Sequence, residues 1–302
     1  MRYAVLIGSQ LAVASAALFA RWGLDEGVSP AVLTAWRLTL ASAVLLPLLH
    51  ARRILRSTPA RRVSPDFPIH TGVLLVAAGA ALALHFWAWF VSLQHIPVAR
   101  STLLVSTTPL WAGLGMWGLT RRCPSRAFWI GLAVAAAGAW LVTSANAAQP
   151  HNPTAIPVLG DGAALLGAMG IAAYFLMVEA YQRSLGTWRV VAWTYPAAAA
   201  ATWLALVMTG STGRAIPSSA PAWGAIAALA LIPQLVGHTA LNWSLKHFSA
   251  GAVGAATLLE PVFAGWLAWL ILTETPAPIQ IVGAGILLAG GALALRARGS
   301  AR

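Results

Sequence analysis

Residues 244–275, SLKHFSAGAVGAATLLEPVFAGWLAWLILTET, have a counterpart 152 residues earlier, at 92–123, SLQHIPVARSTLLVSTTPLWAGLGMWGLTRRC. The two stretches align without a gap and have the same residue at seven positions. The matching positions are Ser92, Leu93, His95, Pro109, Ala112, Gly113 and Trp117 against Ser244, Leu245, His247, Pro261, Ala264, Gly265 and Trp269. A repeat of this length indicates that the chain is built from two copies of one design.

The same offset extends beyond these stretches. It pairs Pro124, Gly131 and Gly138 with Pro276, Gly283 and Gly290, and it pairs Trp36-Arg37 with Trp188-Arg189. We therefore predict two repeats, 1–145 and 157–302, joined by an external linker at 146–156.

Composition indicates that both repeats lie in a membrane. Hydrophobic residues make up 59% of the 302 residues and charged residues only 9%, against roughly 25% charged residues in soluble domains. Windows of about 20 apolar residues, enough to cross a bilayer, occur near 4–22, 31–49, 70–93, 97–120, 126–145, 157–181, 189–209, 222–245, 249–272 and 277–296. The predicted fold is an all-α integral membrane protein with ten transmembrane helices. Five spans per repeat would make the second copy inverted relative to the first.

The basic residues predict the orientation. If both termini are cytoplasmic, all of the 19 Lys and Arg residues lie in or beside inner segments except Arg21, Arg37, Arg100 and Arg214, as the positive-inside rule requires. We expect a multi-pass protein of the cell inner membrane. Charge spread over loops, with no basic face, argues against nucleic-acid binding. The single Cys123 excludes a disulfide framework and a Cys-based metal site, and we expect no metal or cofactor.

Three polar residues share one face of the eighth predicted span. Gln234, His238 and Asn242, here called the polar stripe, are spaced i, i+4 and i+8, whereas Leu235 and Thr239 are expected off this face. Polar groups there must face protein or water, so the stripe forms either a dry hydrogen-bond ladder or the wall of a cavity. His85 and Trp89 of the third span are expected opposite it.

Matched prolines predict helix breaks in the fourth and ninth spans. Pro109 and Pro261 each remove one backbone hydrogen bond, which would leave the carbonyls of Val105 and Thr257 unsatisfied. Equivalent breaks near the middle of both halves are typical of a transporter's central site. Glu260, beside the second break, is a candidate for proton coupling or a structural acceptor.

Two further residues are candidates for the substrate pathway. Arg37 lies two turns into the second span, where a guanidinium needs a partner or water. It could bind an anion near the outer mouth, or it could pair with Glu26, with helix carbonyls or with interfacial water. Tyr174 of the sixth span is the other candidate. In the first span, Gln10 and Arg21 share a face that we expect to turn inward.

The stretch LLEPVFAGWLAWLILTETP at 258–276 with Gly283 and Gly290, and TTPLWAGLGMWGL at 107–119 with Gly131 and Gly138, resemble the drug/metabolite transporter superfamily, specifically EamA-type permeases. The resemblance covers nearly the whole chain. It implies ten helices in two inverted halves around a central cavity and secondary transport of small metabolites, often export of amino acids or toxic compounds. The related organellar sugar-phosphate translocators resemble this fold but bind phosphate through basic residues in the later helices. Spans eight to ten here contain no internal Lys or Arg, so the resemblance implies that a phosphorylated substrate is less likely.

Two other classes of protein fit the sequence less well. An intramembrane enzyme is disfavoured because the chain has no HExxH or GxSxG motif and no pair of intramembrane Asp residues. A non-transporting membrane assembly protein would need neither matched prolines nor a buried Glu. The expected partners are a small-molecule substrate and the lipid bilayer, with the protein a monomer or homodimer.

Overall fold

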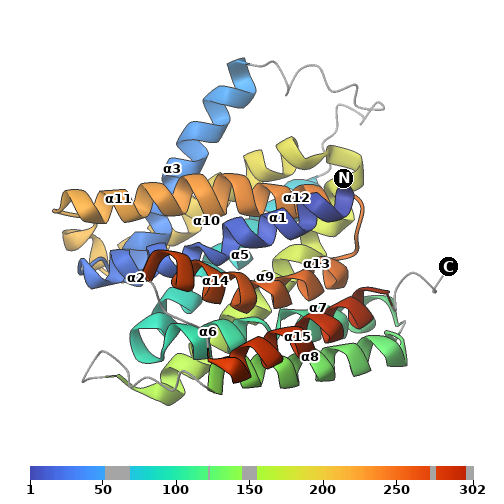
Figure 1. The fold of residues 1–302 in the computed structure, drawn as a ribbon. Coiled ribbons are helices and arrows are strands. Elements are labelled where there is room, and N and C mark those ends of the chain that lie inside the picture. The colour runs from blue at the N-terminus through green and yellow to red at the C-terminus, as the bar shows by residue number, and fades with distance from the viewer. Residues whose placement is uncertain (52–68, 122, 145–154, 273–276, 297–302) are drawn as a thin grey trace.

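The computed structural model describes residues 1–51, 69–121, 123–144, 155–272 and 277–296, and all of its regular elements in these ranges are helices (Figure 1). In chain order they are α1 (Arg2–Ala14), α2 (Ala16–Asp25), α3 (Pro30–Ala51), α5 (Ile69–His95), α6 (Val98–Val105), α7 (Thr108–Thr120), α8 (Arg126–Ser144), α9 (Pro157–Leu185), α10 (Thr187–Met208), η1 (Ser211–Arg214), α11 (Ala220–Leu229), η2 (Ala230–His238), α12 (Thr239–Ser244), α13 (Ala250–Ala256), η3 (Thr257–Leu259), α14 (Glu260–Leu272) and α15 (Pro278–Arg296).

Six stretches are long and apolar enough to cross a membrane: Arg2–Asp25, Pro30–Ala51, His70–His95, Pro157–Gln182, Thr187–Met208 and Ala220–Ser244. Three shorter apolar helical stretches accompany them: Arg126–Leu141, Ala250–Ala264 and Ile281–Ala294. The predicted all-helical, multi-pass architecture is confirmed at this level. The count of ten spans stays a prediction.

The repeat is most direct in α8 and α15. Both helices have 19 residues, begin 152 residues apart and lie side by side (Figure 1). A Cβ atom added at Gly131 would come within 2.8 Å of the Gly290 carbonyl oxygen, and one added at Gly138 within 2.7 Å of the Gly283 carbonyl oxygen. Each contact is the other with the two helices exchanged, which is the signature of a two-fold axis between them. Glycine permits this close approach because it carries no side chain.

The offset changes in another pair of helices. α3 and α10 contact each other and both have 22 residues, but they begin 157 residues apart. Arg37 is the eighth residue of α3, whereas Arg189 is only the third residue of α10. The predicted pairing of Trp36-Arg37 with Trp188-Arg189 is therefore wrong as a structural equivalence, since Thr194 occupies the helix position that corresponds to Arg37.

Helical structure is interrupted immediately before each of the two matched prolines. α6 ends at Val105 and α7 begins at Thr108, so Pro109 lies in the first turn of α7, where a missing N–H is tolerated. The Thr108 hydroxyl donates to the Val105 carbonyl at 2.7 Å. In the second half, the 3₁₀ turn η3 precedes Pro261, and the Glu260 N–H donates to the Thr257 carbonyl. The expectation that both carbonyls lack a partner is wrong, because local bonds satisfy them.

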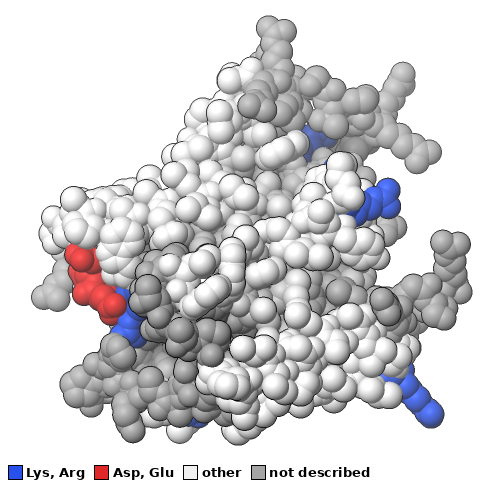
Figure 2. Space-filling view, in the orientation of Figure 1, with Lys and Arg blue, Asp and Glu red and all other residues white. Residues whose placement is uncertain are grey.

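Charge separates along the length of the helices. The first residue of α1 and the last residue of α15 lie at the same end of the molecule (Figure 1). On the face drawn in Figure 2, basic side chains mark that end, acidic side chains with adjoining basic ones lie at the opposite end where α2 ends, and a largely uncharged belt runs between the two ends. This distribution suits a helix bundle embedded in lipid.

Candidate functional site

Among the described residues, the largest fully buried side chain belongs to Arg37, in the first half of α3. Its Nε donates to Oε1 of Gln234 at 3.0 Å. The guanidinium carbon lies 3.7 Å from the centre of the Phe86 ring, within range of a cation–π interaction. The terminal nitrogens Nη1 and Nη2 have no hydrogen-bond partner among the described residues. A buried cation is thus held by an amide oxygen and an aromatic face, without a carboxylate.

The polar stripe is buried along its whole length, with Gln234, His238 and Asn242 at 0%, 3% and 0% exposure. Its N-terminal part, Gln234 and His238, lies on η2, a π-helical segment that contains Pro233. In a π-helix the bonds run from i to i+5, so the residue five positions on comes onto the same face. Tyr195 accordingly reaches both the Gln234 carbonyl, at 3.4 Å, and the Thr239 hydroxyl, at 3.1 Å. The prediction that Thr239 lies off the face is wrong for this reason.

Asn242, at the C-terminal end of the stripe, is hydrogen-bonded to the neighbouring helix α9. The Tyr174 hydroxyl donates to Asn242 Oδ1 at 2.9 Å, and Gln182 Nε2 donates to the same oxygen at 3.4 Å. Asn242 Nδ2 donates to the His238 carbonyl at 2.8 Å. At the N-terminal end, Nε2 of Gln234 and Nδ1 of His238 have no partner within the described ranges. The stripe therefore combines features of both expected alternatives: a hydrogen-bond ladder at Asn242, and unsatisfied polar groups, as in a cavity wall, at Gln234 and His238.

His85 and Trp89 of α5 lie near the N-terminal end of the stripe, where His85 is close to His238. His85 Nδ1 lies 2.8 Å from the Gly167 carbonyl, and since a carbonyl only accepts, this nitrogen carries the proton. The ring centres of His85 and His238 are 6.4 Å apart, and those of His85 and Trp89 are 6.1 Å apart and stacked. Trp89 Nε1 has no partner among the residues that the structure describes.

Phe86 meets His238 edge to face, with ring centres 5.0 Å apart. The two positions differ by 152, the offset of the repeat. Equivalent residues can touch only beside the axis that relates the halves. The pseudo-two-fold axis therefore passes through the polar cluster formed by Arg37, His85, Trp89, Gln234 and His238, which we call the central cluster.

Gln10, Gln182 and Tyr195 are buried polar residues that no sequence motif identifies. Gln10 on α1 is fully buried, and neither amide atom has a partner in the described parts of the chain. The only signals were an inward-facing position for Gln10 and, for Tyr195, a lone tyrosine in an alanine-rich helix. Neither distinguishes a site residue from an ordinary core residue.

The described acidic residues lie outside the central cluster. Asp25 pairs with Arg21 at 3.0 Å and Asp161 with Arg100 at 2.6 Å. Glu26, one of the partners expected for Arg37, instead accepts from Ser219 at 2.8 Å. Glu179 accepts the Ala250 N–H at 2.7 Å, at the N-terminus of α13. The half-buried Glu260 carboxylate receives no hydrogen bond or ion pair from any residue that the structure describes.

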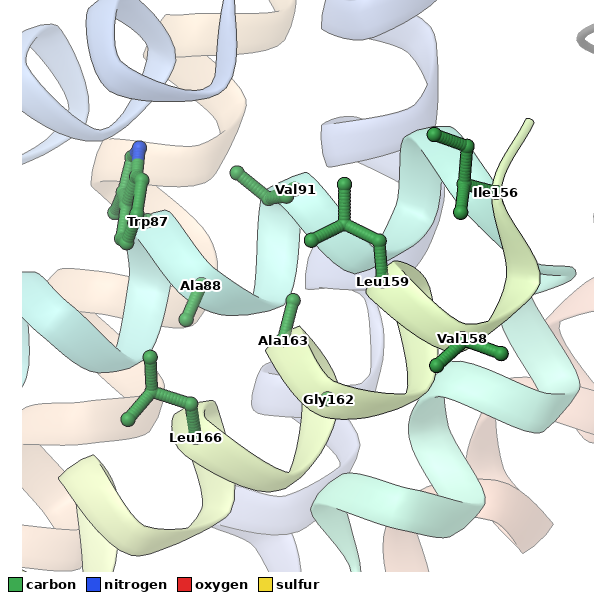
Figure 3. Close-up of a pocket in the computed structure, with 9 residues that line it drawn as sticks. All are labelled: Trp87, Ala88, Val91, Ile156, Val158, Leu159, Gly162, Ala163 and Leu166. Atoms are coloured by element: carbon green, nitrogen blue, oxygen red, sulfur yellow. The ribbon is translucent and has the colours of Figure 1, made fainter. Parts of the chain in front are cut away.

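A groove of about 540 Å³ opens between α5 and the first turns of α9 (Figure 3). Figure 3 shows apolar side chains from both helices around it, and its lining residues are Trp87, Ala88, Val91, Ile156, Val158, Leu159, Gly162, Ala163 and Leu166. None of the pathway candidates lines the groove. The lining offers almost no polar group that could orient a polar cargo.

Comparison with known proteins adds a family match over both halves. The model of the EamA-like transporter family matches residues 2–144 and 158–296. The chain is 26% identical over 224 residues to the pseudopaline exporter CntI of Pseudomonas aeruginosa strain UCBPP-PA14, and 25% identical to that of strain PAO1, in each case over 74% of both proteins. A crystal structure with 21% identity superimposes with a TM-score of 0.72 over 97% of each chain, which shows a shared fold.

Proposed function

Because this chain belongs to the EamA-like transporter family, we propose that it is a secondary active transporter that exports a small metabolite. Amino acids and toxic organic compounds are the proposed classes of cargo. The proposed route is across the bacterial inner membrane, by alternating access of two inverted repeats of five helices each.

The observation that carries this proposal is the central cluster. It draws Arg37, His85 and Trp89 from the first half and Gln234 and His238 from the second, around the axis between them. Several of its polar atoms lack a protein partner among the described residues. A buried unsatisfied polar group costs about 1–3 kcal/mol and a charged one more, so a stable protein keeps such a set where a substrate or water can pair with it.

The fold offers a way to expose this cluster alternately to the two sides. α8 and α15 meet in a reciprocal contact that can serve as the fixed line about which the halves move. The interruptions before Pro109 and Pro261 let the fourth and ninth spans bend near their middle. In this scheme the end that carries both termini is cytoplasmic, and Glu260, which lacks a polar partner in the described parts, carries the coupling proton.

Reconstitution into liposomes tests the proposal. Purified protein is assayed for flux of a panel of amino acids and amphiphilic amines, with Gln234→Leu as the site variant and Val236→Ala as its matched control. Val236 belongs to the same helical segment but is 60% exposed. We expect flux in the parent and the control, and loss in Gln234→Leu with an unchanged size-exclusion profile. Conversion of a compound without flux would establish an enzyme, and equal flux in all three proteins would remove the central cluster from the pathway.

A further inference from the structure

Arg37 has unused hydrogen-bond donors. A guanidinium carries five N–H donors, and the structure uses only the one on Nε, which bonds to Gln234 Oε1 at 3.0 Å. Nη1 and Nη2 have no partner among the described residues, and neither has Nε2 of Gln234 beside them. The unpartnered atoms of Arg37 and Gln234 are all donors. The group that would complete the site is therefore an acceptor.

The charge at this point is also uncompensated. Four described carboxylates are engaged elsewhere: those of Asp25, Glu26, Asp161 and Glu179. No ion pair joins Arg37 to Glu260 or to any other described residue. A buried charge without a counter-charge is strongly destabilising. The acceptor that the site requires is therefore an anion.

We propose that Arg37 and Gln234 bind a carboxylate group of the transported molecule. The Gln234 oxygen holds the guanidinium through Nε, which leaves the edge formed by Nη1 and Nη2 for a two-point contact with a planar carboxylate. Phe86 covers one face of the guanidinium at 3.7 Å, so the ligand approaches in its plane. The substrate class is a small amphiphilic carboxylate or zwitterion. This assignment of the anion as cargo rests on the transport function proposed above.

The surroundings favour a carboxylate over other anions. A phosphate carries close to two charges at neutral pH, and the central cluster supplies one permanent cation, since Arg21 and Arg100 pair with Asp25 and Asp161. Chloride cannot use a two-point edge. Successive ring contacts lead away from the guanidinium through Phe86, His238, His85 and Trp89, and they suit an uncharged or aromatic body attached to the carboxylate.

Acetate is the probe, because it is small enough to enter any site that accepts a carboxylate. The melting temperature of the purified full chain in detergent is followed while sodium acetate replaces sodium chloride at constant ionic strength. We expect a saturable rise of roughly 3 °C, absent in Arg37→Gln. No rise, a rise of the same size in Arg37→Gln, or an equal rise with added chloride would each overturn the proposal.

Gln234→Glu tests the same site without a ligand. The new carboxylate would accept from Arg37 Nε and supply the missing charge within the protein. We expect a higher melting temperature without acetate, no further rise with it, and loss of flux. Gln182→Glu is the matched control, because Gln182 is equally buried but bonds to Asn242, roughly 12 Å along the stripe from Gln234. It should lower the melting temperature and keep the acetate response. If the two variants behave alike, the carboxylate site is refuted.

The two proposals can fail separately. Flux in liposomes without an acetate effect on melting would leave transport standing and reject the carboxylate anchor. An acetate effect that depends on Arg37, without flux of any compound, would leave the anchor standing and reject transport.

Discussion

Replacing Gly138 with Ala tests the contact that joins the two halves. An added Cβ would lie 2.7 Å from both the Gly283 carbonyl oxygen and Leu287 Cα, and all of these neighbours are backbone atoms that cannot rotate away. Ordinary contact begins at 3.4 Å, so α8 and α15 would have to separate locally by at least about 0.7 Å, since Leu287 N would lie nearer still. A gap of that size forfeits a quarter to a half of the dispersion energy of each atom pair it opens. Overpacking of this kind costs about 1–3 kcal/mol, which lowers the melting temperature by roughly 2–12 °C.

The measurement is thermal unfolding of the purified protein, with Gly285→Ala as the control. Gly285 lies in the interior of α15, exposed, and an added Cβ there would meet nothing within 4 Å. That variant should be neutral or stabilised by up to about 1 kcal/mol, because Ala favours helix over Gly. The two substitutions are chemically identical and differ only in what they face. If Gly138→Ala melts at the temperature of Gly285→Ala, the close reciprocal packing of α8 and α15 is wrong.

Three other predictions concern orientation, coupling and the pathway. A reporter active only outside the membrane should be active when fused after Gln149 and silent after Arg62, two sites outside the described residues; the reverse pattern would invert the proposed topology. Glu260→Gln should abolish proton-driven accumulation and leave substrate exchange partly intact, and a variant that still concentrates substrate would make Glu260 structural. In a Cys123→Ser background, single cysteines at Gln234 and His238 should react with a small hydrophilic thiol reagent, more slowly with substrate present, whereas cysteine at the lipid-facing Val236 should stay unreactive in the apolar phase; equal labelling of all three would place none of them in a selective water-filled path.

The general architecture was accessible from sequence because it depends on local composition and on a repeat. A span of about 20 apolar residues is required by the thickness of the bilayer, so six of the predicted spans appear as single apolar stretches. The helix interruptions were also accessible, since proline acts on its own helix. The partner of the Val105 carbonyl was not, because a lost backbone hydrogen bond does not reveal that the side-chain hydroxyl of Thr108 replaces it.

The partners within the central cluster could not be predicted in this way. Arg37 bonds to a residue 197 positions away, and such a pairing depends on how helices pack. The π-helical segment at Pro233 also escaped prediction, because a proline in an apolar run indicates a break without indicating its type. The Trp36-Arg37 pairing failed for the opposite reason: the two identical dipeptides lie at different positions of helices that begin 157 residues apart.

The contact between Phe86 and His238 implies something about ancestry and freedom to change. In a dimer of two identical five-helix chains, a residue beside the symmetry axis faces its own copy, so that Phe would meet Phe and His would meet His. In such a dimer a guanidinium at the position of Arg37 would occur twice near the same centre, where this chain has Arg37 on one side and Thr194 on the other. Joining the halves in one polypeptide removes that constraint. Each half can then acquire its own chemistry at the shared centre while the scaffold around it remains duplicated.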